Sequence, residues 1–235
     1  MQNINNSISF TGSRKFLRDA DWVCRKVKSE FPMISPTRVY YSNTDRVSSN
    51  KKYMAFVLDK ELQLHQDRAD RRFLKSSYKF IKEVLYSATV NKIGNCSEYV
   101  SLAEMVSRMN GVKNCYRLSF RDAASEKMLA SSSAKSVNHT ALLISKNPIK
   151  GNEIKEDECL IIDPWLGISG RMKDVIERYK NEFPQILKIK DDTQLKYHIS
   201  GNFDLSEFDL EVLKGGFPSL IYPNKSKANE FMKIG

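Results

Sequence analysis

The stretch Gly94–Tyr99, GNCSEY in one-letter code, opens a segment with helical periodicity. Asn95 can cap this helix, with Glu98 three residues later as its partner in a capping box. Cys96 then becomes the first helical residue. Gly111 is expected to end the helix. The predicted apolar face consists of Tyr99, Leu102, Ala103, Val106 and Met109.

The predicted position of Cys96 gives its thiol the character of a nucleophile. A residue at a helix start meets unpaired N–H groups and the positive end of the helix dipole, and both favour the reactive thiolate. Further along, His139 precedes one strand-like run and Asp163 ends another. Thiolate, imidazole and carboxylate can together perform acyl transfer. We therefore predict Cys96 as nucleophile, His139 as base and Asp163 as the acid that orients the imidazole.

The spacing of the last two residues suggests how they meet. Segments 138–145 and 158–163 are predicted strands, joined by a polar loop that contains Pro148 and Gly151. A hairpin centred on Gly151 would place His139 directly opposite Asp163, within reach of a hydrogen bond. A shift by one residue would break this arrangement. Pro164 favours the extended backbone that a strand end at Asp163 requires.

Acyl transfer also needs donors for the oxyanion, and here several residues are candidates. The backbone N–H of Cys96 is one donor. Asn91 is the preferred side-chain donor, because Asn95 would be occupied as the helix cap. Trp165 either walls the acyl pocket or packs in the core. His198, on a predicted strand, is the second choice as base because no acid is comparably placed.

Composition limits the remaining possibilities. A chain of 235 residues with 41% hydrophobic residues suits one large domain, or a core with a small appendage. Its four cysteines lack the spacing of a zinc or redox motif, so we predict no metal and no cofactor, with reduced cysteines of which Cys24, Cys115 and Cys159 belong to the core. Because no long apolar run is present, no transmembrane helix is expected.

The net charge of +10 is compatible with an acidic protein partner or an anionic surface. A dense basic patch comprises Arg68, Arg71, Arg72, Lys75, Lys79 and Lys82. We favour a solubilising helix surface as the interpretation of this patch. No nucleic-acid-binding motif accompanies it, so nucleic acid is not an expected partner.

The pattern along the chain predicts an α+β protein in three parts. Residues 1–13, rich in Asn, Ser and Ile, are expected to be disordered. Residues 14–90 are mainly helical, with helices at 15–31 and 68–90 and a short strand at 53–58. Residues 91–235 form an α+β core. Its other expected elements are strands at 114–120, 186–189 and 195–199, a helix at 171–183 and a loop beside the site at 121–137.

Over residues 91–170 the chain resembles the papain-like and transglutaminase-like cysteine enzymes. The resemblance rests on GNC at the helix start, His139-Thr140-Ala141 at a strand start, and the sequence IIDPW over 161–165. It implies a Cys-bearing helix packed on an antiparallel sheet that carries the His and Asp. Papain-type enzymes place an oxyanion glutamine about six residues before the nucleophile, where this chain has Val90, with Asn91 next to it.

Within this superfamily the chain is most similar to bacterial secreted effectors and toxin domains, several of which are protein-glutamine deamidases. The resemblance implies acyl transfer on a protein side-chain amide, foremost glutamine deamidation of a host protein in the host cytosol. The composition of residues 1–13 is similar to the secretion signals of needle-type systems. Two alternatives stay open: a papain-like cysteine protease that uses the same three residues, and a non-catalytic interaction module with a basic surface.

Overall fold

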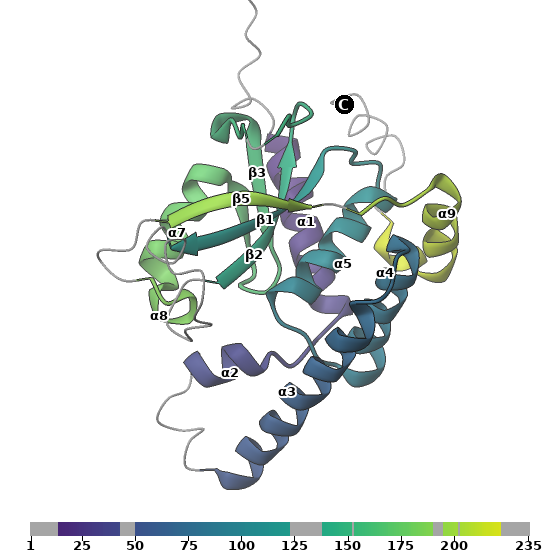
Figure 1. Ribbon diagram of the computed structural model, residues 1–235. Coiled ribbons are helices and arrows are strands. Elements are labelled where there is room, and N and C mark those ends of the chain that lie inside the picture. The colour runs from purple at the N-terminus through teal and green to yellow at the C-terminus, as the bar shows by residue number, and fades with distance from the viewer. Residues whose placement is uncertain are drawn as a thin grey trace, which may run out of the picture.

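The computed structural model describes residues 14–42, 50–122, 138–151, 153–189, 195–201 and 203–221. The fold is mixed α+β, built around a five-stranded antiparallel sheet with the strand order β4-β3-β2-β1-β5 (Figure 1). The predicted N-terminal segment 1–13 lies outside the described residues, as does most of the predicted loop 121–137.

The helices are α1 (Arg14–Glu30), α2 (Pro36–Ser42), α3 (Lys51–Arg71), α4 (Ser77–Tyr86), α5 (Cys96–Met109), α7 (Met172–Glu182), α8 (Pro184–Leu187) and α9 (Glu207–Gly216). The strands are β1 (Cys115–Asp122), β2 (Asn138–Ser145), β3 (Cys159–Asp163), β4 (Ile168–Arg171) and β5 (Leu195–Gly201). A π-helical turn (Ser87–Asn91) extends α4, and short 3-10 turns occupy Glu156–Glu158 and Pro218–Leu220.

Helix α5 begins at Cys96, as predicted, and lies at the centre of the molecule. The capping box between Asn95 and Glu98 is present, and the backbone N–H of Asn95 donates to Oε2 of Glu98 over 3.0 Å. Gly111 follows the helix with a φ of 87°. The predicted apolar face is buried, but so are Glu98, Ser101, Glu104 and Ser107. The helix is therefore enclosed on nearly all sides, where an amphipathic pattern predicts one buried face.

Gly94 allows a close approach that brings the start of α5 against the segment between α1 and α2. A Cβ at Gly94 would lie 2.5 Å from Sδ of Met33 and 2.9 Å from Cβ of Glu98. Ile34 and Ile93 form a parallel bridge beside it, with Gly94 N–H donating to the Ile34 carbonyl. This pairing sets the residue after Ile34, which is Ser35, beside Asn95.

The helical portion before α5 differs from the prediction in two places. The expected strand at 53–58 is wrong, because these residues belong to α3, which Asn50 caps by accepting a hydrogen bond from the Tyr53 N–H. The expected single helix at 68–90 is also wrong. This segment contains the end of α3, then a break, and then α4, which Ser76 caps. Local caps therefore decided boundaries that the hydrophobic pattern did not.

Near the C-terminus, the expected strand at 186–189 is wrong, because Pro184 starts the short helix α8 there. Strands β1, β2, β3 and β5 lie close to their predicted positions, whereas β4 was not predicted. Four residues with a glycine at position 170 give too little alternation for a strand prediction. Pairing with β3 is what extends this segment.

The register of the β2–β3 hairpin differs from the prediction by two residues. Leu142 pairs with Ile162 and Ser145 with Cys159, so His139 does not lie directly opposite Asp163. The hairpin is centred one residue beyond Gly151. Because the displacement is an even number of residues, the two side chains remain on one face of the sheet. Diagonal neighbours of this kind are still within reach of long side chains.

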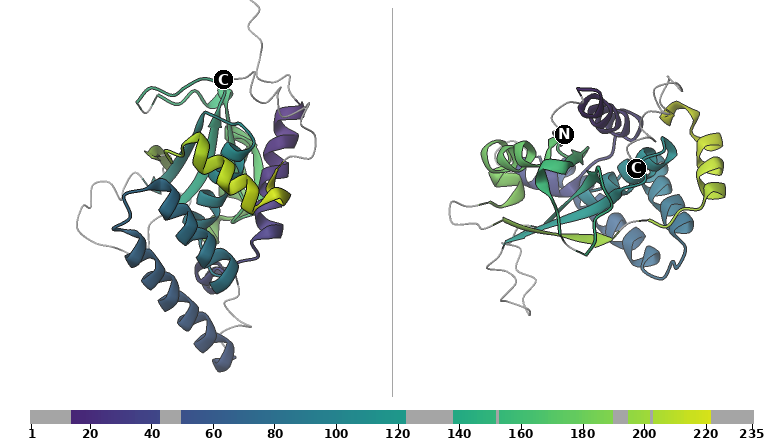
Figure 2. Two further views of the ribbon diagram at one scale, coloured as in Figure 1. Left: turned by 90° about the vertical axis from the view of Figure 1, so that its right-hand side faces the viewer. Right: turned by 90° about the horizontal axis from the view of Figure 1, so that it is seen from above.

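The helices surround the sheet and share one hydrophobic core with it. Figure 1 shows α7 and α8 at one end of the sheet and α4, α5 and α9 at the other. Helix α1 packs against α5 and against β3 and β4. In Figure 2 the first half of α3 extends away from the body of the molecule, while its last turns lie near α5. In the described part of the chain, no helix has the length and apolar character needed to cross a membrane.

Candidate active site

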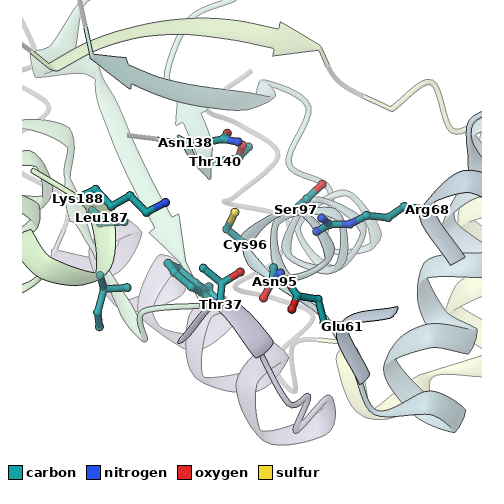
Figure 3. Close-up of a pocket in the computed structure, with 12 residues that line it drawn as sticks. Thr37, Glu61, Arg68, Asn95, Cys96, Ser97, Asn138, Thr140, Leu187 and Lys188 are labelled. Carbon is teal, nitrogen blue, oxygen red and sulfur yellow. The ribbon is translucent and has the colours of Figure 1, made fainter. Parts of the chain in front are cut away.

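A pocket of about 530 Å³ opens at the start of α5 (Figure 3). Segments that are far apart in the sequence contribute its walls. The lining residues are Thr37, Glu61, Arg68, Asn95, Cys96, Ser97, Asn138, Thr140, Trp165, Ile186, Leu187 and Lys188. Figure 3 shows the sulfur of Cys96 pointing into the space between these side chains. The volume lies in the range typical of ligand pockets.

His139 lies between two residues of β2, Asn138 and Thr140, that line this pocket, and it pairs with Asp163. The imidazole Nε2 is 2.6 Å from Oδ2 of Asp163, and the two side chains are 1% and 0% exposed. Among the described residues, the other ring nitrogen, Nδ1, has no hydrogen-bond partner of ordinary geometry. Cys96 nevertheless lies near enough to the ring to be among the smaller causes that raise the pKa of His139. The three residues predicted from the sequence are thus brought together.

The environment of His139 favours the imidazolium form. Burial alone would lower the pKa of His139. The charge of Asp163 and the hydrogen bond to it, together with smaller effects of Cys96, outweigh burial and raise this pKa to about 10. The ring can therefore hold a proton at neutral pH, as the acid that protonates a leaving group must.

Two further hydrogen bonds fix the carboxylate of Asp163. The hydroxyl of Tyr179, on α7, donates to Oδ2 over 2.8 Å, and the backbone N–H of Leu166 donates to Oδ1 over 3.1 Å. With His139 these donors satisfy a carboxylate that is completely buried, which would otherwise be costly. Burial, followed by the charge of Asp163, raises the pKa of Tyr179 well above its usual value. Tyr179 therefore remains a donor.

Aromatic rings hold the imidazole of His139 in place. The ring of Tyr179 stands edge-on to it at a centroid distance of 5.3 Å. Phe120 stacks on the imidazole at 6.0 Å, and Trp165 lies at 5.3 Å on a tilt. Only a narrow range of ring orientations fits between these neighbours, so the two nitrogens stay directed as described.

A buried ion-pair network anchors the first turn of α5. Arg68 donates to both carboxylate oxygens of Glu98, over 3.0 and 2.6 Å, and Arg71 donates to Oε1 over 2.9 Å. Burial would raise the pKa of Glu98, but the two arginines outweigh it and lower this pKa. From β1, Arg117 binds the carbonyl and hydroxyl of Ser97. These contacts hold the two residues that follow Cys96 in place.

This network corrects the interpretation of the basic patch. Arg71 is 3% exposed and Arg68 is part-buried, so neither belongs to a solubilising surface. The other four members, Arg72, Lys75, Lys79 and Lys82, are exposed.

Two sequence candidates lie outside the pocket lining. The side-chain amide of Asn91 donates to Oδ2 of Asp67 over 3.1 Å, so Asn91 is committed to another contact. His198 lies on the edge strand β5, opposite Ser119 of β1. Trp165 both lines the pocket and packs in the core with 3% exposure. Cys24, Cys115 and Cys159 are buried free thiols.

Two residues of the site, Tyr179 and Ser35, carry no functional signal in the sequence. Tyr179 follows Met172 and Val175 on the buried face of α7, so its spacing indicates only a core residue. Ser35 is buried, accepts a hydrogen bond from Nε1 of Trp165 over 2.7 Å, and donates one to Oδ1 of Asn95 over 2.6 Å. No local pattern predicts contacts across 130 and 60 residues of sequence.

Comparison of the chain with protein-family models, with curated proteins and with solved structures gives no match.

Proposed function

We propose that this protein is a Cys-His-Asp thiol enzyme that performs acyl transfer on a side-chain amide of a protein, foremost the deamidation of glutamine. The observation that carries the proposal is the arrangement of three groups. A half-buried thiol at the start of α5 lines a pocket, and a buried imidazole–carboxylate pair with an N–O distance of 2.6 Å lies near it. A buried ion pair can also have a purely structural role. A structural role alone would not require a thiol next to the pair.

The chemistry follows from the positions of the protons. Nε2 of His139 is bonded to Asp163, which leaves Nδ1 for the thiol of Cys96. Thiolate and imidazolium form when that proton moves to the ring, and contacts of this kind often tighten only with substrate bound. The thiolate attacks the amide carbon, and the imidazolium proton leaves with the nitrogen as ammonia. Water then attacks the thioester, gives a proton to His139, and the carboxylic acid departs.

The shape of the site supports a side-chain amide as substrate. The pocket is walled on several sides, by α2, α3, α5, β2 and the α8 segment. A side chain with a short part of its backbone can enter such a pocket, whereas a protease binds several residues of an extended peptide. As part of the same proposal, the enzyme is a secreted bacterial effector whose substrate is a host protein.

The test uses intact-mass analysis of proteins from host cells that express either the full chain or its Cys96→Ala variant. Deamidation exchanges an amide for an acid and adds about one dalton per glutamine. We expect at least one host protein to gain this mass only with the unchanged chain. The matched control is Cys159→Ala, which removes a buried thiol on β3 and should leave the modification intact.

Other outcomes would overturn the proposal. If host proteins are cleaved instead, and this cleavage requires Cys96, the protein is a papain-like protease. An effect on host cells that survives Cys96→Ala, with no change of mass in any protein, would indicate an interaction module.

A further inference from the structure

Asn95 precedes the nucleophile and lines the pocket with it. Figure 3 shows the side chains of Asn95 and Cys96 next to each other at the start of α5. An amide beside an attacking thiolate can stabilise the transition state only if its NH₂ group, and not its oxygen, faces the substrate. The orientation of the Asn95 amide is therefore the deciding question.

The hydrogen bonds of Ser35 settle that orientation. The indole Nε1–H of Trp165 can only donate, and it donates to Oγ of Ser35 over 2.7 Å. The backbone N–H of Arg38 donates to the same oxygen over 3.3 Å. Both lone pairs of the hydroxyl are thus used, so its hydrogen goes to Asn95, 2.6 Å away. The atom of Asn95 that faces Ser35 must accept, and is therefore the carbonyl oxygen Oδ1.

The amide nitrogen of Asn95 is left over. Its backbone N–H donates to Oε2 of Glu98, and its backbone carbonyl accepts from the N–H of Tyr99 over 3.2 Å. Within the described part of the chain, Nδ2 has no hydrogen-bond partner. Every other polar group of Asn95 is occupied, and the free donor belongs to a side chain that lines the pocket.

We propose that Asn95 is the side-chain donor of the oxyanion hole, with Ser35 and Trp165 as positioning residues. When the thiolate attacks, a carbon–sulfur bond forms and the carbonyl electron pair moves onto oxygen. Nδ2 of Asn95 and the backbone N–H of Cys96 hold that oxygen until the pair returns and the leaving group departs. The inference rests on the proposed function, and it assigns to Asn95 the role for which the sequence favoured Asn91.

The test compares two reactions of Cys96 in the purified full chain. Acetylation by p-nitrophenyl acetate passes through an oxyanion, whereas alkylation by iodoacetamide displaces iodide from a saturated carbon and does not. Asn95→Ser removes the amide and keeps a good N-cap. Acetylation should fall about 100- to 1,000-fold, while alkylation changes less than about threefold. Ser35→Ala frees the amide to turn, so a smaller loss of acetylation, about tenfold, is expected.

The matched control is Asn91→Ala, which removes an amide that is bonded to Asp67 outside the pocket lining. Both of its rates should equal those of the unchanged protein. The inference is overturned if Asn95→Ser is acetylated at the unchanged rate. It is equally overturned if acetylation and alkylation fall by the same factor, because the amide would then act on the thiol or on the fold.

Cys96→Ala separates this inference from the proposed function. If the unchanged protein is acetylated no faster than Cys96→Ala, the thiol enzyme itself is refuted, and Asn95 has no oxyanion to stabilise. If the unchanged protein is acetylated faster and Asn95→Ser matches it, only the role of Asn95 is refuted.

Discussion

At the scale of single residues, the proposed mechanism depends on the proton that the imidazole of His139 holds beside Asp163. The pKa of His139 is raised to about 10 because the charge and the hydrogen bond of Asp163 outweigh burial. A raised pKa in the folded state means that folding takes up a proton once the pH exceeds the ordinary histidine pKa of about 6.5. The protonated ring therefore stabilises the fold fully below that pH, and this stability is lost as the pH rises through about 10.

Asp163→Asn tests this linkage, because it removes the main cause of the raised pKa of His139. We expect the free energy of unfolding of the unchanged protein to exceed that of the variant by more below about pH 6.5 than near pH 10. Urea unfolding of both proteins across this range gives the comparison. A difference in stability that stays constant with pH would show that Asp163 does not hold the proton on His139.

Tyr179→Phe isolates the hydrogen bond between α7 and the carboxylate of Asp163. The ring and its contacts with His139 remain, and only the donor to Oδ2 is lost. Removal of one hydrogen bond to a buried charged group should cost about 1.5–3 kcal/mol of stability. Thermal unfolding measures this cost. Stability equal to that of the unchanged protein would mean that the hydroxyl does not support the carboxylate.

At the scale of secondary-structure elements, the position of Cys96 depends on how the start of α5 is anchored. Glu98 is 3% exposed and binds two arginines of α3, of which Arg71 is equally buried. Removal of one partner from a buried ion pair leaves an uncompensated charge in the interior. Helix α3 and helix α5 are therefore coupled through this carboxylate.

Glu98→Ala should lower the free energy of unfolding by about 3–5 kcal/mol, because it strands the guanidinium of Arg71 in the interior. The matched control is Glu182→Ala on α7, which breaks an exposed pair with Arg178 and should leave stability nearly unchanged. Urea denaturation of both variants measures the difference. Equal effects of the two substitutions would contradict the anchoring role of Glu98.

The elements differ in how far local sequence predicts them. The start of α5 follows from Asn95, Cys96 and Glu98 alone, because a capping box is a contact between neighbours in sequence. The predicted strand at 53–58 is wrong, because an apolar run without a clear period fits either a strand or a helix. The cap at Asn50 decides in favour of a helix. The register of the β2–β3 hairpin depended on the shape of a long loop, which the position of Gly151 does not determine.

At the scale of the whole molecule, the site is assembled from segments that meet only in the folded chain. The order of cysteine, histidine and aspartate along the sequence predicted Cys96, His139 and Asp163 as the triad. Tyr179 and Ser35 could not be predicted, because their partners lie 16 and 60 residues away on other elements. Sequence patterns thus indicated the three residues of the proposed triad, while the residues that contact and orient them became visible only with the tertiary structure.

The fold also separates Cys96 from the other three thiols. Burial is the main cause that raises the pKa of Cys24 to about 12 and that of Cys159 to about 11, and it raises the pKa of Cys115 as well. A thiol with such a pKa is protonated at neutral pH and inert towards electrophiles. Cys96, half-buried in the pocket lining, is the thiol that we propose to be reactive.

The most direct test is to measure, by peptide mapping, the rate at which iodoacetamide labels each cysteine of the folded protein at neutral pH, in the unchanged chain and in His139→Ala. We expect Cys96 to be labelled while Cys24, Cys115 and Cys159 are spared. Labelling of Cys96 should slow at least about tenfold in His139→Ala, which lacks the imidazole that takes up the thiol proton. Labelling of Cys96 at the same rate in both proteins would show that His139 does not activate this thiol.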